Sequence, residues 1–187
     1  LFFLKNKIYN KPKLIGYILN KFIYYLSILF ATILVAQERP EVKAIRTNLT
    51  IKVDGLLDEK IWENIEPITQ FIQRLPQDGA QPTEKSEMRI IYDDNYLYFG
   101  FTFFDSEPEK VRATILNRGG WIHRDDKLEI ALDTYLDRRN AYLFEMNPLG
   151  TQDDALISDE SRPSLDEWAW DGIYLSEGRV TEFGWIL

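Results

Sequence analysis

The 187-residue chain contains no cysteine and a single histidine, His123. Without cysteine it can form neither disulfide bonds nor a thiolate metal site. Nucleophilic catalysis commonly needs a nucleophile with a partnered base, and a lone histidine beside Asp125 and Asp126 is far more often a surface or capping residue than a base. The carboxylates are numerous, but nothing in the sequence alone pairs two of them. The chain therefore indicates binding rather than bond-making chemistry.

Positive charge is scarce outside the N-terminal segment. Residues 1–37 carry five lysines and no acidic residue, which leaves 17 of the 22 basic residues and all 30 acidic residues in the remainder, a net charge of −13. Nucleic-acid binding requires a basic surface that displaces counterions from phosphates. We therefore expect no nucleic-acid partner.

A mostly apolar run of 15 residues, Phe22–Ala36, follows Lys21 and ends in a small residue. This order is typical of a secretory signal, and the run is shorter than the ~20 residues of a membrane-spanning helix. We expect residues 1–37 to be a signal peptide with an N-terminal extension, so that the mature protein is exported to the periplasm, the outer membrane surface or the medium. An uncleaved N-terminal anchor stays open as the alternative, because Leu34 is a poor residue three positions before the cleavage site.

The remainder divides into an extended lead, residues 38–49, and one globular unit, residues 50–187. In the globular unit apolar residues alternate at period two, as in Leu97, Phe99 and Phe101, which is typical of half-buried strands. Strands are expected over residues 51–53, 88–92, 96–104, 128–132, 141–147, 173–175, 179–180 and 184–187, a short helix over 58–65 and a helical turn after Ser106.

Short alternating strands with frequent turns predict an all-β fold, an antiparallel β-sandwich of jelly-roll type with one or two short helices. Trp62 and Trp185 are expected in its core. Because the last strand pattern, residues 184–187, has no closing turn, we expect the sandwich to be truncated at its C-terminus, with an open edge that favours aggregation.

Several separate motifs resemble one known family. They are IKVDGLLDEKIW (51–62), RIIYDDNYLYFG (89–100), LDTYLDRRNAYLFEMNPLG (132–150), WAWDGIY (168–174) and EFGW (182–185). Residues 50–187 resemble carbohydrate-binding module family 9, and more closely the N-terminal domains of large bacterial surface proteins that continue into an outer-membrane-type barrel. The resemblance implies a sugar-binding β-sandwich, downstream domains of the same polypeptide, and in some relatives a bound calcium ion.

Sugars are held by flat aromatic faces and by planar polar groups that bond their hydroxyls. The candidate ligand-binding residues are Trp121, Arg138, Arg139, Glu145, Asn147, Gln152, Trp168 and Trp170. Trp168 and Trp170 are two residues apart and would face the same side of an extended segment. Core packing is the alternative for any single tryptophan. For the arginines, the alternative is a salt bridge to Asp133, Asp137 or Glu145.

Two acidic pairs suit calcium, which prefers hard oxygen ligands. They are Asp125 with Asp126 and Asp153 with Asp154. No EF-hand spacing is present, and such pairs are mostly solvated turns. A calcium site at these four residues is therefore a prediction that competes with a purely structural role.

These observations predict non-catalytic carbohydrate binding in an exported protein that takes part in polysaccharide breakdown or uptake. A structural domain that packs on a membrane barrel without binding sugar is the first alternative. Exposed tryptophans favour sugar binding, whereas burial of Trp121, Trp168 and Trp170 favours the structural domain. Part of an O-glycosyl hydrolase is the second alternative, and it requires two carboxylates that face one cleft.

Overall fold

The computed structural model describes residues 17, 19–25, 41–159, 161–165 and 167–187, in two units, Leu1–Glu41 and Val42–Leu187. In the first unit, Tyr17 and residues 19–25 are helical. Most of the expected signal segment and its cleavage site lie outside the described residues. Within the described residues, no helix has the length and apolar character needed to cross a bilayer.

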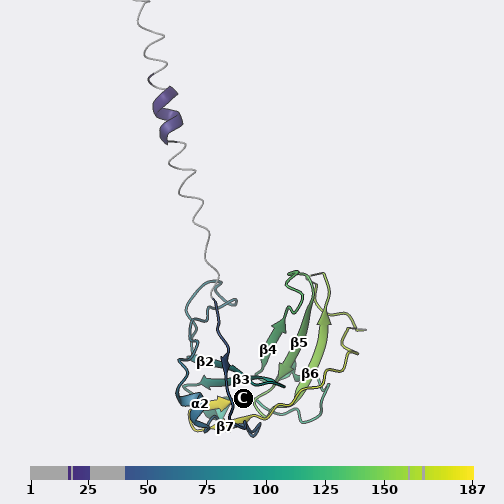
Figure 1. The fold of residues 1–187 in the computed structure, drawn as a ribbon. Coiled ribbons are helices and arrows are strands. Elements are labelled where there is room, and N and C mark those ends of the chain that lie inside the picture. Colours follow the sequence, from purple (N-terminus) through teal and green to yellow (C-terminus); the bar gives the residue numbers. More distant parts are fainter. Residues whose placement is uncertain (1–16, 18, 26–40, 160, 166) are drawn as a thin grey trace, which may run out of the picture. The chain divides into compact units, whose positions relative to one another are not determined.

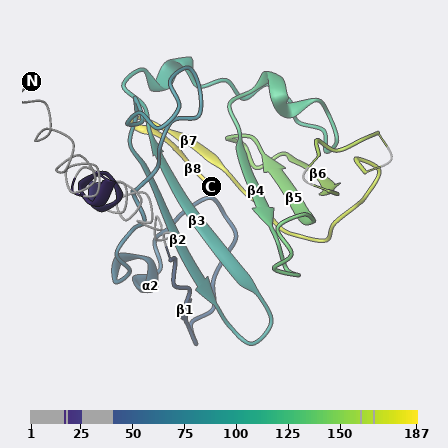
Figure 2. The same ribbon diagram turned by 90° about the horizontal axis from the view of Figure 1, so that it is seen from above.

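The second unit is an all-β sandwich of two sheets, as the sequence predicts (Figure 1 and Figure 2). One sheet has the order β1 (Ile45–Arg46), β2 (Ser86–Tyr92), β3 (Leu97–Phe104), β8 (Gly184–Ile186), β7 (Arg179–Thr181). The other has the order β4 (Leu128–Leu132), β5 (Ala141–Met146), β6 (Gln152–Ile157). The helical turns are α2 (Lys60–Glu63), η1 (Pro108–Lys110) and η2 (Ile122–Arg124). Among the described strands, every pair is antiparallel except β1 with β2.

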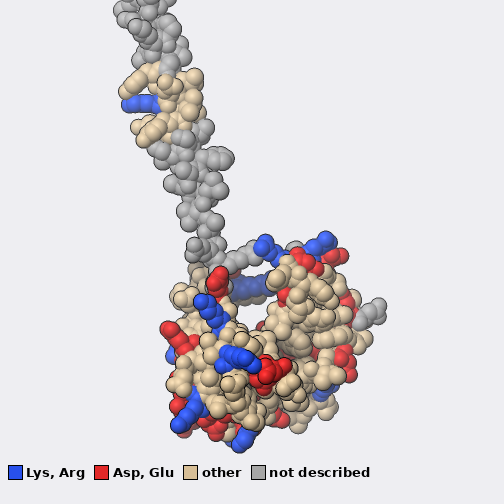
Figure 3. All heavy atoms as spheres, in the orientation of Figure 1, with Lys and Arg blue, Asp and Glu red and all other residues tan. Residues whose placement is uncertain are grey.

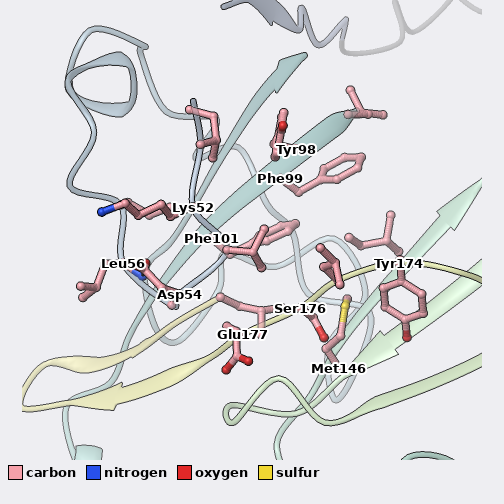
Figure 4. Close-up of a pocket in the computed structure, with 18 of the residues that line it drawn as sticks. Lys52, Asp54, Leu56, Tyr98, Phe99, Phe101, Met146, Tyr174, Ser176 and Glu177 are labelled. Atoms are coloured by element: carbon pink, nitrogen blue, oxygen red, sulfur yellow. The ribbon is translucent and has the colours of Figure 1, made fainter. Parts of the chain in front are cut away.

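The core lies between the two sheets. Phe99, Phe101 and Phe103 stack in a row along β3, with ring centroids 6.4 and 5.7 Å apart, which confirms that they share one face. Trp185 of β8 stacks on Phe103 at 3.9 Å and is 6% exposed, so its expected place in the core is confirmed. An apolar cavity of about 230 Å³ remains between β3 and the inner face of β4 and β5 (Figure 4).

Helix α2 packs closely on the five-stranded sheet because Gly100 has no side chain. A Cβ at Gly100 would lie 2.8 Å from Leu57 and 3.1 Å from Trp62. Trp62 is 4% exposed and donates its indole N–H to Glu59 at 2.9 Å, so it is a core residue with a satisfied polar atom. The expected place of Trp62 in the core is confirmed.

The strand predictions were wrong in three places. Residues 51–53 and 173–175 form no strand, and β6 was not predicted. Side chains hold the first two segments instead: Glu59 accepts from the amide of Lys52, and Gln152 donates to the carbonyl of Tyr174. Strand β6 was not recognised because it begins with polar residues on both faces. Of these, Gln152 and Asp154 form hydrogen bonds with loop residues instead of facing solvent.

Candidate functional site

Three carboxylates lie side by side across the three-stranded sheet. Glu129 of β4 pairs in register with Glu145 of β5, which pairs with Asp153 of β6. Paired residues of adjacent strands point to the same face. Their neighbours Ile130 and Phe144 line the cavity between the sheets, so the carboxylates point to the outer face.

Lys127 reaches two of these carboxylates from the residue before β4. Its Nζ lies 2.5 Å from Oε1 of Glu129 and 2.8 Å from Oε1 of Glu145. The side chain of Glu145 is only 6% exposed, whereas that of Glu129 is 51% exposed. A single ammonium group is therefore shared between a buried and an exposed carboxylate.

Burial raises the pKa of two of the three carboxylates in the row. Burial, together with the neighbouring Glu129, raises the pKa of Glu145 to about 7 despite the opposing effect of Lys127. Burial also raises the pKa of Asp153, against the hydrogen bond that it accepts from the amide of Asp154. For Glu129 burial is outweighed by its hydrogen bonds with Lys127 and Glu145, which lower its pKa. The row therefore includes a proton-sharing pair of glutamates.

A pocket of about 350 Å³ opens over this row. Its walls are two indoles, one imidazole, three charged groups and two small or apolar residues: Trp121, Trp168, His123, Lys127, Glu145, Asp153, Gly119 and Leu165. Three of the predicted ligand-binding residues, Trp121, Glu145 and Trp168, thus come together from three separate segments. Asp153, predicted as a metal ligand, joins them.

Trp121 has an unusual backbone conformation. Its φ of 26° and ψ of 51° lie in the left-handed region, where non-glycine residues are uncommon. The side chain is 67% exposed, with the ring of His123 at 4.8 Å and the guanidinium of Arg124 at 5.9 Å from its centroid. Such outliers recur at binding sites. The loop before η2 therefore holds a large apolar ring in solvent beside the pocket.

Trp168 and Trp170 do not face the same side. Trp168 lines the pocket, whereas Trp170 packs on Tyr142 and Phe144 with ring centroids 5.1 and 5.8 Å away. The segment is a turn rather than an extended chain, because the amide of Trp168 bonds to the carbonyl of Ser164. The inference of a shared side was wrong because it assumed strand geometry.

Asn147 lies outside the pocket, in a buried hydrogen-bond network. Its Nδ2 donates to the carbonyl of Ile115 and to Oδ2 of Asp125, and its Oδ1 accepts from the amides of Leu149 and Thr151. An asparagine amide offers two donor hydrogens and two acceptor lone pairs, so its bonding capacity is used up within the protein. This arrangement supports a structural role.

Gln152 and the two arginines also lie apart from the pocket. Nε2 of Gln152 donates to the carbonyl of Tyr174 and to Oγ of Ser176. Arg138 and Arg139 lie in the exposed turn between β4 and β5, and Arg139 pairs with Asp159 at 2.6 Å, an acidic residue that we did not anticipate. Their part in ligand binding stays a prediction without support from this pocket.

The four aspartates marked for calcium do not converge. Asp125 accepts hydrogen bonds from Thr114, Ile115 and Asn147, and these bonds outweigh the effect of burial and lower its pKa. Asp126 accepts from the amide of Arg112, and Asp154 from Arg118 and the amide of Gly172. Among the described residues, no group of three or more histidines or acids is placed to hold a metal. The donor set does not fit calcium, because protein donors already occupy most of these oxygens.

Lys127 and His123 are pocket residues that sequence reasoning missed. Lys127 lies two positions before Glu129, whose alternation with the apolar Leu128 and Ile130 puts Glu129 on the polar face of its strand. The same alternation could have put Lys127 there. Arg118 was also missed. Its guanidinium pairs with Asp154 and Asp171 and donates to the carbonyl of Gly172, and no local sequence pattern predicts these long-range contacts.

The all-β sandwich and the pocket lined by Trp121, Trp168, Glu145 and Asp153 are compatible with a carbohydrate-binding-type domain. Residues 53–156 match the family model described as "Carbohydrate family 9 binding domain-like". The match covers more than half of the chain, and the chain belongs to this family. Searches among curated proteins and among solved structures returned no match.

Proposed function

We propose that the pocket over β4, β5 and β6 binds carbohydrate without cleaving it. The main support for the proposal is that one pocket is lined by two tryptophans, Trp121 and Trp168, and by two carboxylates, Glu145 and Asp153. Indole faces pack on the C–H surfaces of a sugar ring, while carboxylates accept hydrogen bonds from its hydroxyls. The membership of the chain in a carbohydrate-binding-like family supports the same function.

The exposure of the tryptophans argues against a purely structural domain. Trp121 is 67% exposed, and Trp168 is half-buried at the pocket wall. Exposing a large apolar ring to water costs free energy, and a ligand that covers the ring removes this cost. Trp170, by contrast, is packed and supports the fold.

Glycoside hydrolysis is the second candidate, because two carboxylates, Glu145 and Asp153, do line one pocket and the pKa of Glu145 is raised to about 7. A glycosidase places its acid and its nucleophile or base on either side of the scissile bond. Glu145 and Asp153 are cross-strand neighbours on one face and approach a ligand from the same side. The geometry therefore favours binding.

The test is titration calorimetry of the exported domain with a broad oligosaccharide panel. We expect Trp121→Ala and Trp168→Ala each to weaken binding roughly tenfold or more, because a lost aromatic contact costs about 0.5–1.5 kcal/mol in addition to lost buried area. Tyr96→Ala is the matched control, since Tyr96 is an exposed ring outside the pocket. Absence of heat with every sugar, or equal loss in the control, contradicts the proposal.

Cleavage is tested in parallel with chromogenic glycosides. We expect no turnover. Turnover that disappears in Glu145→Gln would instead establish the hydrolase.

We further propose that the domain is exported and serves a larger surface protein in polysaccharide breakdown or uptake, with a membrane barrel among its downstream domains. The lysine-led apolar segment, Phe22–Ala36, supports export. Mass spectrometry of the exported protein is expected to find an N-terminus near Gln37. An intact N-terminus would indicate an anchor instead.

A further inference from the structure

The charges of the pocket do not balance. Lys127 supplies one positive charge, which lies within 2.8 Å of both Glu129 and Glu145. Asp153 lines the same pocket and is Glu145's partner in register, yet within the described part of the chain no ion pair reaches it. Its Oδ1 accepts one hydrogen bond, from the amide of Asp154 at 3.0 Å. Lys127 and Arg118 lower the pKa of Asp153 through space but form their ion pairs with other carboxylates. The pocket therefore keeps one half-buried carboxylate without a direct ion pair.

From this imbalance we infer that the pocket selects sugars that carry a free, protonated amino group, with Asp153 as the residue that binds the ammonium. The inference rests on the proposed function, because it names the class of sugar that the same pocket takes.

An ammonium group suits this position better than a hydroxyl. A carboxylate that accepts from a charged donor forms a hydrogen bond roughly twice as strong as a neutral one, and a desolvated carboxylate gains most from it. The indole faces of Trp121 and Trp168 on the walls also attract a cation. A positive charge beside Asp153 offsets the burial that raises its pKa.

The same arrangement disfavours other ligands. An N-acetylated sugar has no positive charge and carries a bulky acetyl group. A sugar acid would bring a further carboxylate to the row formed by Glu129, Glu145 and Asp153, and like charges at this distance repel. Selection therefore comes from both attraction and repulsion.

The experiment compares three oligosaccharides with the same β-1,4 linkage and length: glucosamine, N-acetylglucosamine and glucose oligomers. Each is titrated calorimetrically into the full exported protein at about pH 5.5, which lies about two units below the pKa of an α-amino group, so that the sugar amine is largely protonated. We expect the glucosamine oligomer to bind about tenfold more tightly than the glucose oligomer, as a charge-assisted hydrogen bond predicts. Equal affinities for the two would overturn the inference.

Asp153→Asn then tests the residue. Asparagine keeps the shape and removes the charge, so the ratio of the affinities for the glucosamine and glucose oligomers is expected to fall to about twofold or less, whatever loss of affinity the two oligomers share. Asp78→Asn is the matched control, because it removes one charge from an exposed loop outside the pocket, and it is expected to keep the preference. Persistence of the preference in Asp153→Asn overturns the assignment of the residue.

The two hypotheses fail differently. If glucose binds as well as glucosamine and Trp168→Ala weakens both, the pocket binds sugar without selecting an amine. If none of the three oligomers binds, the proposed function fails together with the inference. The preference for glucosamine is measured on the wild-type protein, so this test remains valid even if the Asp153→Asn protein folds poorly.

Discussion

Glu145 shows how one residue can couple the pocket to pH. Its carboxyl group is buried between Lys127 and Glu129, and burial with Glu129 raises its pKa to about 7 from 4.5. Between these values the folded chain binds more protons than the unfolded chain, so the free energy of unfolding falls as pH rises through that range. Asp153, whose pKa is also raised, contributes with the same sign.

We predict that the wild-type domain loses on the order of 1–3 kcal/mol of stability between about pH 4.5 and 7.5 through this cluster. Glu145→Gln should reduce that loss, because glutamine resembles the protonated acid. Urea unfolding at several pH values measures the effect. Glu63→Gln, an exposed residue of α2, is the control and should keep the wild-type slope. An unchanged slope in Glu145→Gln would show that Glu145 does not titrate in this range.

At the scale of elements, a hydrogen-bond clamp joins two loops. Asp125 and Asn147 bond to each other and to the segment of Thr114 and Ile115, which precedes the loop that carries Trp121. Asn147 is fully buried, and every bond of its amide is made within the protein. These hydrogen bonds therefore fix the position of the segment that leads into that loop.

We predict that Asn147→Ala lowers the free energy of unfolding by about 2–4 kcal/mol, because it leaves the amides of Leu149 and Thr151 without their acceptor and removes one of the two donors to the carbonyl of Ile115. Asn95→Ala, in an exposed turn, should cost less than about 0.5 kcal/mol. Denaturant unfolding of both variants measures the difference. A loss below about 1 kcal/mol in Asn147→Ala would contradict the clamp.

At the scale of the whole domain, the acidic and basic side chains are interspersed over the face in Figure 3, and the chain after residue 37 carries a net charge of −13. Such a charge attracts divalent cations weakly over the surface. A dedicated site would need converging oxygens, which Asp125, Asp126, Asp153 and Asp154 do not supply.

We therefore predict that the melting temperature is the same within about 2 °C in millimolar calcium and in a chelator, since a ligand that stabilises must bind the folded state specifically. Differential scanning calorimetry makes the comparison, with magnesium as the control for general ionic effects. A rise of several degrees with calcium alone would reveal a site that forms when calcium binds.

Local patterns in the chain were enough to predict most of the fold. The strands β2, β3, β4 and β5 lie within two residues of their expected bounds, since each carries its own alternation of apolar side chains. The polar face of β5 at Glu145 follows from the same alternation. β6 was missed because its first residues, Gln152 to Asp154, bond to distant loops.

What the sequence by itself determined is the class of fold, the core positions of Trp62 and Trp185 and the placement of Glu145 on the strand face opposite Tyr142 and Phe144, because hydrophobic periodicity acts within a single element. Only the tertiary structure decided which of the candidate site residues lie together in one pocket. The row of Glu129, Glu145 and Asp153 depends on the register of three strands, and the separation of Trp168 from Trp170 depends on a turn held by Ser164. Register and loop packing arise from contacts between residues distant in the chain, which no local pattern contains.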